Sequence, residues 1–163
     1  MNQLWAPWRM AYIADIDKAG TGCVFCAKVS EEDDRKHLIL HRGKTCFVIM
    51  NLFPYNNGHL LVIPYAHVAE IGAIDRDTST ELWDLLCRAQ RALRETMHPD
   101  GFNIGINLGR TAGAGIDTHL HAHIVPRWNG DTNFMPVVGE TKVISQELGA
   151  TYDTLLPAFR STI

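Results

Sequence analysis

Residues 113–128 read Gly113-Ala114-Gly115-Ile116-Asp117-Thr118-His119-Leu120-His121-Ala122-His123-Ile124-Val125-Pro126-Arg127-Trp128, and this stretch decides the fold. Its histidines alternate with apolar residues, which is the period of a β-strand with His119, His121 and His123 on one face. The apolar residues between them then face a core. Successive histidine Cα atoms would lie about 6.6 Å apart at roughly 3.3 Å of rise per residue, which suits an extended anion such as a polyphosphate. Pro126 is expected to end the strand or to confine it to a sheet edge.

Two simpler uses of the three histidines compete with a phosphate site. They could form a solvated strand face, but Thr or Lys would build such a face more simply. They could also bind a metal ion alone, which would require all three to converge on one point. The glycines just before the strand favour a phosphate, because a loop without side chains lets a phosphate approach the backbone closely.

The composition is that of an ordinary globular chain. Its 163 residues fit one domain with a sizeable core, and 46% are hydrophobic while 20% are charged. The formal net charge of −3 provides no overall basic field for nucleic acid, so an anionic substrate must be recognised locally. No stretch approaches the ~18 consecutive apolar residues of a membrane span. Neither nucleic acid nor a membrane is therefore expected as a partner.

The N-terminus and the cysteines predict a cytoplasmic protein. Residues 1–9 lack the apolar run of a signal peptide. The four cysteines are Cys23, Cys26, Cys46 and Cys87. Without a signal peptide they are not expected to form a disulfide framework. Residues 4–13 are apolar and aromatic, so we expect them to pack on their own domain, on a partner subunit or over the site.

Apolar spacing predicts the remaining elements. Strands are expected at 37–43, 44–50, 59–64 and 102–109, with a short one near 139–144. Leucines and alanines three and four residues apart predict a long helix over 78–98, which Pro99-Asp100-Gly101 ends. Ser145 could cap a final helix that Pro157 interrupts.

The triad stretch resembles the signature of the histidine triad (HIT) superfamily of nucleotide hydrolases and transferases. That signature is His-apolar-His-apolar-His-apolar-apolar, and here Pro126-Arg127 follows it. The pattern is highly specific. The resemblance extends from Cys23 to about Val143, which is most of the chain.

The resemblance implies an α+β fold with a HIT-like antiparallel sheet of about five strands, one long helix and a short helix. Residues 1–163 would form a single domain, in which 1–22 are an N-terminal arm and 129–163 a C-terminal tail. The apolar arm, the long helix and the habit of the family together predict a homodimer.

The middle histidine of the family signature is the nucleophile, and it aligns with His121. Neutral imidazole is nucleophilic near pH 7, because its unperturbed pKa is ~6.5. It would attack the α-phosphorus of a nucleotide derivative and form a covalent nucleotidyl-histidine. A backbone carbonyl is expected to accept a hydrogen bond from its other ring nitrogen, although the sequence does not identify which carbonyl. His123 would donate to a non-bridging oxygen, and Asn107 would contact the reacting phosphate.

Substrate contacts are implied on two loops. Asn51 matches the family asparagine that contacts the ribose. His59 is expected either to neighbour the active site or to orient the triad as a structural histidine. Backbone N–H groups at Gly113, Gly115 and Ile116 could stabilise developing negative charge.

Cys23 and Cys26 have CxxC spacing, which alone fits half a zinc site, a redox pair or two buried thiols. No βαβ pattern surrounds them, which weakens the redox interpretation. A structural zinc ion needs about four ligands. In HIT proteins with this CxxC the other two are histidines, which map to His67 and His119, and the resemblance therefore implies a structural Zn²⁺.

The acceptor of the nucleotidyl group decides the product. The hydrolase branches carry a glutamine where this chain has Gly115, and the aromatic arm and the stretch 127–131 also resemble the diadenosine tetraphosphate phosphorylase (ATP adenylyltransferase) subgroup. Phosphorolysis of diadenosine tetraphosphate to ADP and ATP is therefore the leading hypothesis. The alternatives are a hydrolase of dinucleoside polyphosphates or nucleoside phosphoramidates, and a nucleotide-binding sensor with little turnover. A sensor has no need of His121, which argues against the last.

Overall fold

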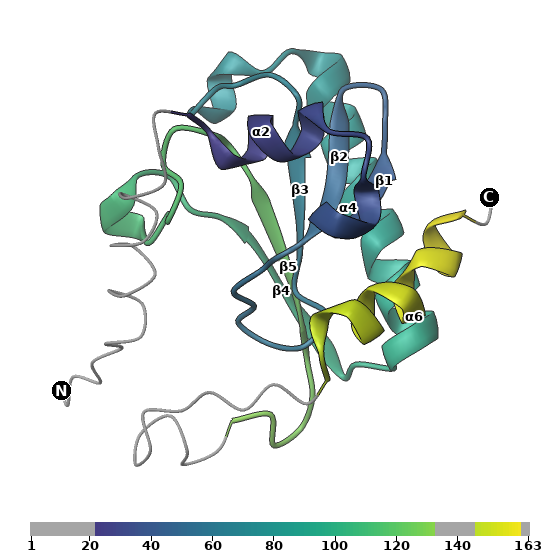
Figure 1. The fold of residues 1–163 in the computed structure, drawn as a ribbon. Coiled ribbons are helices and arrows are strands. Elements are labelled where there is room, and N and C mark those ends of the chain that lie inside the picture. The colour runs from purple at the N-terminus through teal and green to yellow at the C-terminus, as the bar shows by residue number, and fades with distance from the viewer. Residues whose placement is uncertain (1–21, 133–145, 161–163) are drawn as a thin grey trace, which may run out of the picture.

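The structure, a computed structural model, describes residues 22–132 and 146–160 (Figure 1). The predicted arm up to residue 21, the predicted strand near 139–144 and Ser145 lie outside these residues. The helices of the described part are α2 (Val24–Ser30), α3 (Asp34–His37), α4 (Arg76–Met97) and α6 (Leu148–Arg160), with 3-10 turns at Ile71–Ala73 and Arg110–Ala112. The strands are β1 (Ile39–Arg42), β2 (Cys46–Met50), β3 (Leu60–Pro64), β4 (Gly101–Ile106) and β5 (Ala122–Arg127).

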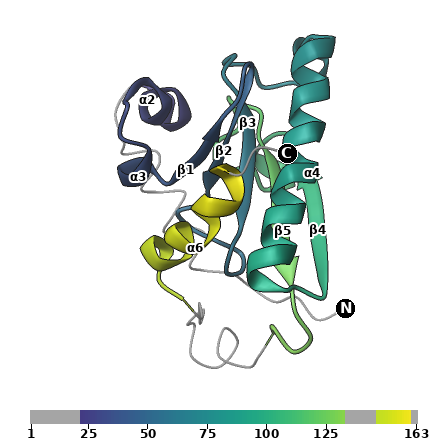
Figure 2. The same cartoon turned by 90° about the vertical axis from the view of Figure 1, so that its right-hand side faces the viewer.

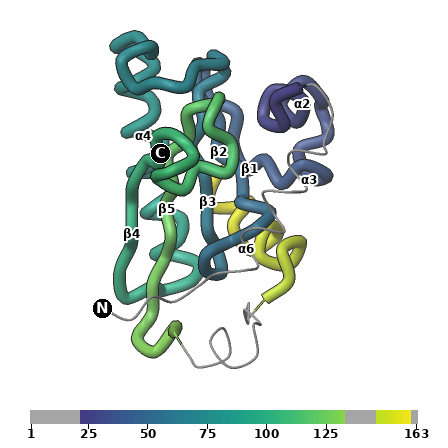
Figure 3. Tube along the Cα trace, turned by 90° about the vertical axis from the view of Figure 1, so that its left-hand side faces the viewer, coloured from purple at the N-terminus to yellow at the C-terminus, as the bar shows by residue number. Residues whose placement is uncertain are grey.

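The five strands form one antiparallel sheet in the order β1-β2-β3-β5-β4, and Figure 3 shows them side by side. In the register of β5, His123 lies between Leu61 of β3 and Gly105 of β4. The predicted α+β fold with a five-stranded antiparallel sheet and one long helix is confirmed. None of the described helices is long and apolar enough to cross a membrane.

Each face of the sheet has its own apolar cluster. Val62 and Ile124 point to the face covered by α4 and α6, where they join the larger buried cluster. Leu61 points to the other face, where it packs in a cluster with Phe25 of α2. His123 shares this face, because directly paired residues of neighbouring strands point the same way. Figure 2 shows the sheet between α2 on one side and α4 on the other.

Helix α4 follows the predicted apolar stripe. Its buried leucines and alanines are Leu82, Leu85, Leu86, Ala89, Ala92 and Leu93. The helix begins at Arg76, earlier than predicted, because the Asp75 side chain caps it by accepting a hydrogen bond from the N–H of Thr78 at 2.8 Å. It ends at Met97, and His98 takes the left-handed conformation with φ 48°, which confirms the predicted end.

Strand β5 begins later than the sequence predicts. His119 and His121 precede the strand, which starts at Ala122. The segment before β5 pairs with a loop and not with a strand. The N–H of Leu120 donates at 2.6 Å to the carbonyl oxygen of Val68, which lies in the loop after β3. The prediction of a strand that starts at His119 is therefore wrong. The apolar residues between the histidines are nevertheless buried as predicted.

Pro126 neither ends β5 nor confines it to an edge, since β5 continues past it and lies between β3 and β4. The missing N–H is tolerated because β3 begins only at Leu60, opposite Ile124, so β5 has no strand partner on that side at Pro126. The carbonyl oxygen of Pro126 accepts a hydrogen bond from the side chain of Asn56 at 3.1 Å instead.

Two further elements differ from those expected. The Asp33 side chain caps α3 by accepting a hydrogen bond from the N–H of Lys36, so His37 belongs to a helix and β1 begins at Ile39. Pro157 lies inside α6 and does not interrupt it. A proline removes one helical hydrogen bond, but tertiary packing holds this helix on the core. Its buried residues are Thr151, Tyr152, Leu155 and Phe159.

Candidate active site and metal cluster

The backbone holds one ring nitrogen of His121. A carbonyl can only accept, so the Nδ1–H of His121 donates to the carbonyl oxygen of His119 at 2.8 Å. Nε2 of the neutral ring therefore carries the lone pair. Burial lowers the pKa of His121, and this outweighs the hydrogen bond to His119, which raises it. The imidazole is accordingly neutral near pH 7 and has a nucleophilic nitrogen.

His123 and His59 form a hydrogen-bonded pair. Nε2 of His59 lies 3.0 Å from Nδ1 of His123. The backbone N–H of Tyr55 donates to Nδ1 of His59 at 3.0 Å, so the proton of His59 must sit on Nε2. His59 then donates to Nδ1 of His123, which places the proton of a neutral His123 on its Nε2. This tautomer makes His123 a hydrogen-bond donor at that atom.

Asn51 and Tyr55 surround this histidine pair. The side-chain nitrogen of Asn51 lies 3.3 Å from Nδ1 of His59, and its oxygen accepts the N–H of Phe53 at 3.0 Å. Tyr55 stacks on His123, with ring centroids 5.8 Å apart and an angle of 18° between the planes. Asn51 therefore braces the loop between β2 and β3 in addition to the ribose contact predicted for it.

The glycine loop leads into the triad, and Asn107 follows the neighbouring strand β4. The N–H of Gly113 donates to the carbonyl oxygen of Arg110 at 2.9 Å, so the turn itself uses this donor. Gly115 and Ile116 follow it on the way to the triad. Asn107 comes directly after β4, and extending the β4–β5 register by one step would set it opposite His121.

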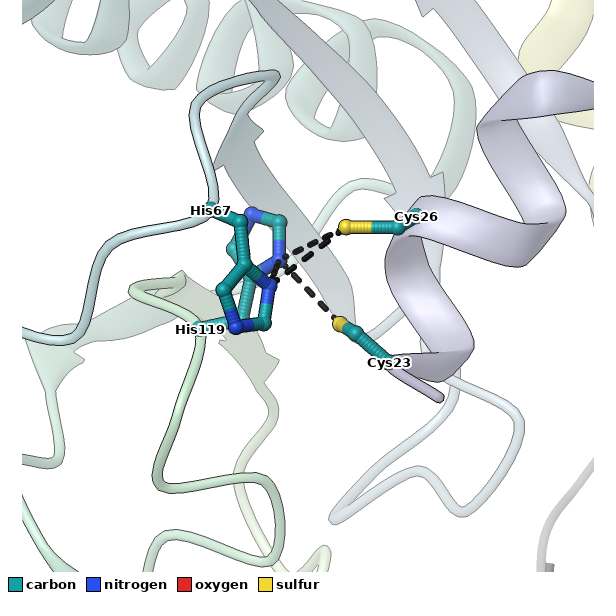
Figure 4. Close-up of side chains that lie close together, drawn as sticks. All are labelled: Cys23, Cys26, His67 and His119. Atoms are coloured by element: carbon teal, nitrogen blue, oxygen red, sulfur yellow. Dashed lines mark hydrogen bonds between the residues drawn. The ribbon is translucent and has the colours of Figure 1, made fainter. Parts of the chain in front are cut away.

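Four sulfur and nitrogen ligand atoms converge at one point, and one of them belongs to the triad histidine His119 (Figure 4). Cys23 and Cys26 come from the start of α2, His67 from the loop after β3, and His119 from the segment before β5. Their ligand atoms all lie within 4.8 Å of one another. The four residues that the resemblance assigned to a metal site are therefore brought together by three separate segments.

The spacing of these atoms fits a tetrahedral metal ion. Nδ1 of His119 lies 3.2 Å from Sγ of Cys23, 3.6 Å from Sγ of Cys26 and 3.2 Å from Nδ1 of His67. Sγ of Cys26 lies 3.4 Å from Nδ1 of His67. Metal–sulfur bonds of about 2.3 Å and metal–nitrogen bonds of about 2.0–2.1 Å give tetrahedral edges of roughly 3.3–3.8 Å. These four distances are close to that range, and all the ligand atoms lie within 4.8 Å of one another.

The protonation of His119 also fits a metal ion. Its Nε2–H donates to the carbonyl oxygen of Pro64 at 2.9 Å, which leaves a lone pair on Nδ1. One lone pair cannot satisfy Cys23, Cys26 and His67 through hydrogen bonds at once, whereas a central cation satisfies all four ligands. Burial lowers the pKa of His119, so it stays neutral as a ligand must.

The HIT domain model matches residues 32–130 of the chain. The chain belongs to the HIT family. The predicted family is thereby confirmed, and the matched range contains all three triad histidines as well as His59 and His67. Only the CxxC pair of the four-residue cluster lies outside this HIT domain match.

Individual HIT proteins resemble the chain over most of its length. A relative from Mycobacterium tuberculosis named AP-4-A phosphorylase is 38% identical over 157 residues, which cover 93% of this chain and 80% of the relative. A relative from Dictyostelium discoideum named bis(5'-adenosyl)-triphosphatase is 31% identical over 93 residues, which cover 57% of this chain and 62% of that one. The crystal structure of a Zn-bound histidine triad family protein from Mycobacterium smegmatis has a TM-score of 0.69 and 31% identity, and the match covers 85% of this chain and 93% of that one.

Two aromatic residues of this HIT site were not predicted from the sequence. Phe25 contacts the rings of both His119 and His121, with centroids 5.6 Å and 5.3 Å away. Tyr55 supplies the N–H that sets the tautomer of His59. A signal existed for Phe25, which lies between the two cysteines of the CxxC motif, but the backbone contact of Tyr55 has no sequence signature.

Proposed function

We propose that this HIT protein transfers a nucleotidyl group from a dinucleoside polyphosphate through a covalent intermediate on His121. Nε2 of His121 attacks the α-phosphorus, a P–N bond forms, and the bond from that phosphorus to the bridging oxygen breaks. The remaining nucleotide leaves with the bridging oxygen. An acceptor then attacks the same phosphorus, breaks the P–N bond and regenerates the neutral histidine.

The observation that carries this proposal is the hydrogen bond that Nδ1–H of His121 donates to the carbonyl oxygen of His119. It leaves the Nε2 lone pair on a neutral ring that is 5% exposed. A nucleophile needs such a lone pair at working pH, and a residue that only binds nucleotide does not. The hydrogen bond also stabilises positive charge that develops on the ring during attack.

The neighbouring residues are proposed to stabilise the phosphate. Nε2–H of His123 can donate to a non-bridging oxygen, and His59 holds the tautomer that makes this possible. Asn107 and the backbone N–H groups of Gly115 and Ile116 are further proposed donors. Gly113 contributes the turn that presents them, since its own N–H bonds to Arg110.

The preferred reaction is phosphorolysis of diadenosine tetraphosphate. ATP would leave in the first step, and inorganic phosphate would accept the adenylyl group in the second to give ADP. Support comes from the 38% identical relative named AP-4-A phosphorylase and from Gly115, at the position where hydrolase branches carry glutamine. The broader expectation, an enzyme among HIT-family nucleotidyltransferases and hydrolases, is confirmed by the relatives of both names.

Product analysis tests the proposed reaction. The protein is incubated with diadenosine tetraphosphate, with and without inorganic phosphate, and the nucleotides are separated by chromatography. We expect ADP and ATP only when phosphate is present. Formation of AMP without phosphate would show hydrolysis in place of phosphorolysis. The relative named bis(5'-adenosyl)-triphosphatase is the observation that supports this alternative. If neither mixture yields a product, the alternative of a nucleotide-binding sensor with little turnover is favoured.

We also propose that the cluster of Cys23, Cys26, His67 and His119 holds a structural Zn²⁺. Its atom spacing and its mixed sulfur and nitrogen ligands suit zinc. A HIT protein of the same fold is Zn-bound in its crystal structure. The ion would hold α2 against the loop after β3 and would take no part in the chemistry.

Dimerisation is a further part of the proposal. Strand β4 lies at the edge of the sheet, and its residues Asn103, Ile104 and Gly105 are exposed. Among the described strands only β5 pairs with β4, and an edge that exposes Ile104 to 44% is a surface on which a second copy could pair. Light scattering should therefore give twice the chain mass of 18.2 kDa. A monomer at micromolar concentration would contradict the dimer.

A further inference from the structure

Phe25 links the metal cluster to His121. It lies within the CxxC motif, one residue before Cys26, and is 6% exposed. Its ring meets His121 at a centroid distance of 5.3 Å and a tilt of 58°, and it meets His119 edge-on at 5.6 Å and 88°. The same turn of α2 that presents the cysteines therefore presses an aromatic ring on the proposed nucleophile.

Two contacts from outside β5 hold His121. The carbonyl oxygen of His119 fixes its Nδ1, and the ring of Phe25 packs against its ring at a tilt of 58°. Neither of these two supports comes from β5, because His119 precedes the strand and Phe25 belongs to α2. His123 of β5 adds a third contact, with its ring centroid 4.9 Å from that of His121 and an angle of 63° between the planes. Both supports from outside β5 belong to segments of the proposed metal cluster, since His119 is a proposed ligand and Phe25 adjoins another, Cys26.

We propose that Phe25 is a positioning residue for His121, and that the metal-binding turn of α2 serves to hold it there. An imidazole can rotate about its side-chain bonds. Packing against a rigid ring restricts that rotation. Phe25 does not need to touch the reacting atoms. This inference rests on the proposed role of His121 as the nucleophile.

Phe25→Ala and Phe25→Leu test the inference in the metal-loaded protein. We expect Phe25→Ala to keep the metal content and nucleotide affinity of the wild type, yet to form the nucleotidyl-histidine about 10–100-fold more slowly, as for loss of a supporting contact. Phe25→Leu should recover part of this loss, because leucine refills part of the space. The nitrogen NMR signals of the His121 ring should broaden or split in Phe25→Ala, which reports the ring position independently of activity.

Phe159→Ala is the matched control. Phe159 is equally buried, at 2% exposed, but it lies in the cluster on the α4 face. It should lower thermal stability and leave the rate of adduct formation and the His121 signals unchanged. A wild-type rate in Phe25→Ala, or loss of metal from both Phe25 variants, would overturn the inference. Absence of an adduct in the wild type would instead overturn the proposed function, and the His121 NMR signals would still decide whether Phe25 positions the ring.

Discussion

His121→Ala is expected to abolish turnover of dinucleoside polyphosphates while nucleotide binding persists. The substitution removes the only group proposed to form the P–N bond, so the loss should far exceed the roughly 10²–10⁴-fold typical of an acid–base helper. Binding should persist because Asn51 and the loop between β2 and β3 are unaffected. A radiolabelled adenosine polyphosphate should label the wild type through an acid-labile bond and leave His121→Ala unlabelled.

Two further histidine variants serve as controls for this expectation. His123→Ala should be milder, because it removes a phosphate donor and leaves the nucleophile in place. His98→Asn removes an exposed histidine at the end of α4, and asparagine tolerates the left-handed conformation there. It should label and turn over like the wild type. Equal labelling of wild type and His121→Ala would show that the nucleophile is another residue.

Cys23→Ser is expected to lose the metal and part of the stability together. The native protein should carry about one zinc per chain, and removing a direct ligand should weaken its binding by more than roughly 100-fold. The proposed ion would join α2 to the loops before β5 and after β3, so its binding free energy would contribute to folding. We expect Tm to fall by more than about 5 °C, because 1 kcal/mol corresponds to ~2–4 °C for a domain of this size.

Cys87→Ser is the matched control for the metal. Cys87 is an exposed cysteine on α4 and is not part of the cluster. This variant should keep both the zinc and the Tm of the wild type in elemental analysis and thermal melts. Native protein without zinc, or Cys23→Ser that retains a full equivalent, would exclude the four-ligand assignment.

Much of the fold follows from local patterns in the sequence. The alternation of apolar residues through Leu120, Ala122 and Ile124 predicts a buried strand face, and these residues are buried. The leucine stripe of α4 likewise predicts its buried side. Such patterns depend on side-chain periodicity within one element, which packing preserves. The family signature added the convergence of Cys23 and Cys26 with two distant histidines.

Contacts between distant segments were decided only by the tertiary structure. The start of β5 at Ala122 depends on the hydrogen bond between Leu120 and Val68. Val68 lies in the loop after β3, far from Leu120 in the sequence. Pro126 is tolerated inside the sheet because β3 ends its pairing with β5 at Ile124. Neither fact is visible in the period of the sequence, since the first depends on a contact with a distant loop and the second on where the neighbouring strand β3 begins.

The proton positions on the site histidines were likewise decided only by the tertiary structure. The sequence determined that His119, His121 and His123 alternate with core residues, and it predicted all three on one face of a strand, whereas only His123 lies within β5. Only the tertiary structure decided that the carbonyl of His119 holds His121, and that the loop before β3 sets the tautomer of His59. A hydrogen bond requires a donor and an acceptor at a defined distance and angle. Those depend on how loops and strands pack together, and residue order alone does not specify them.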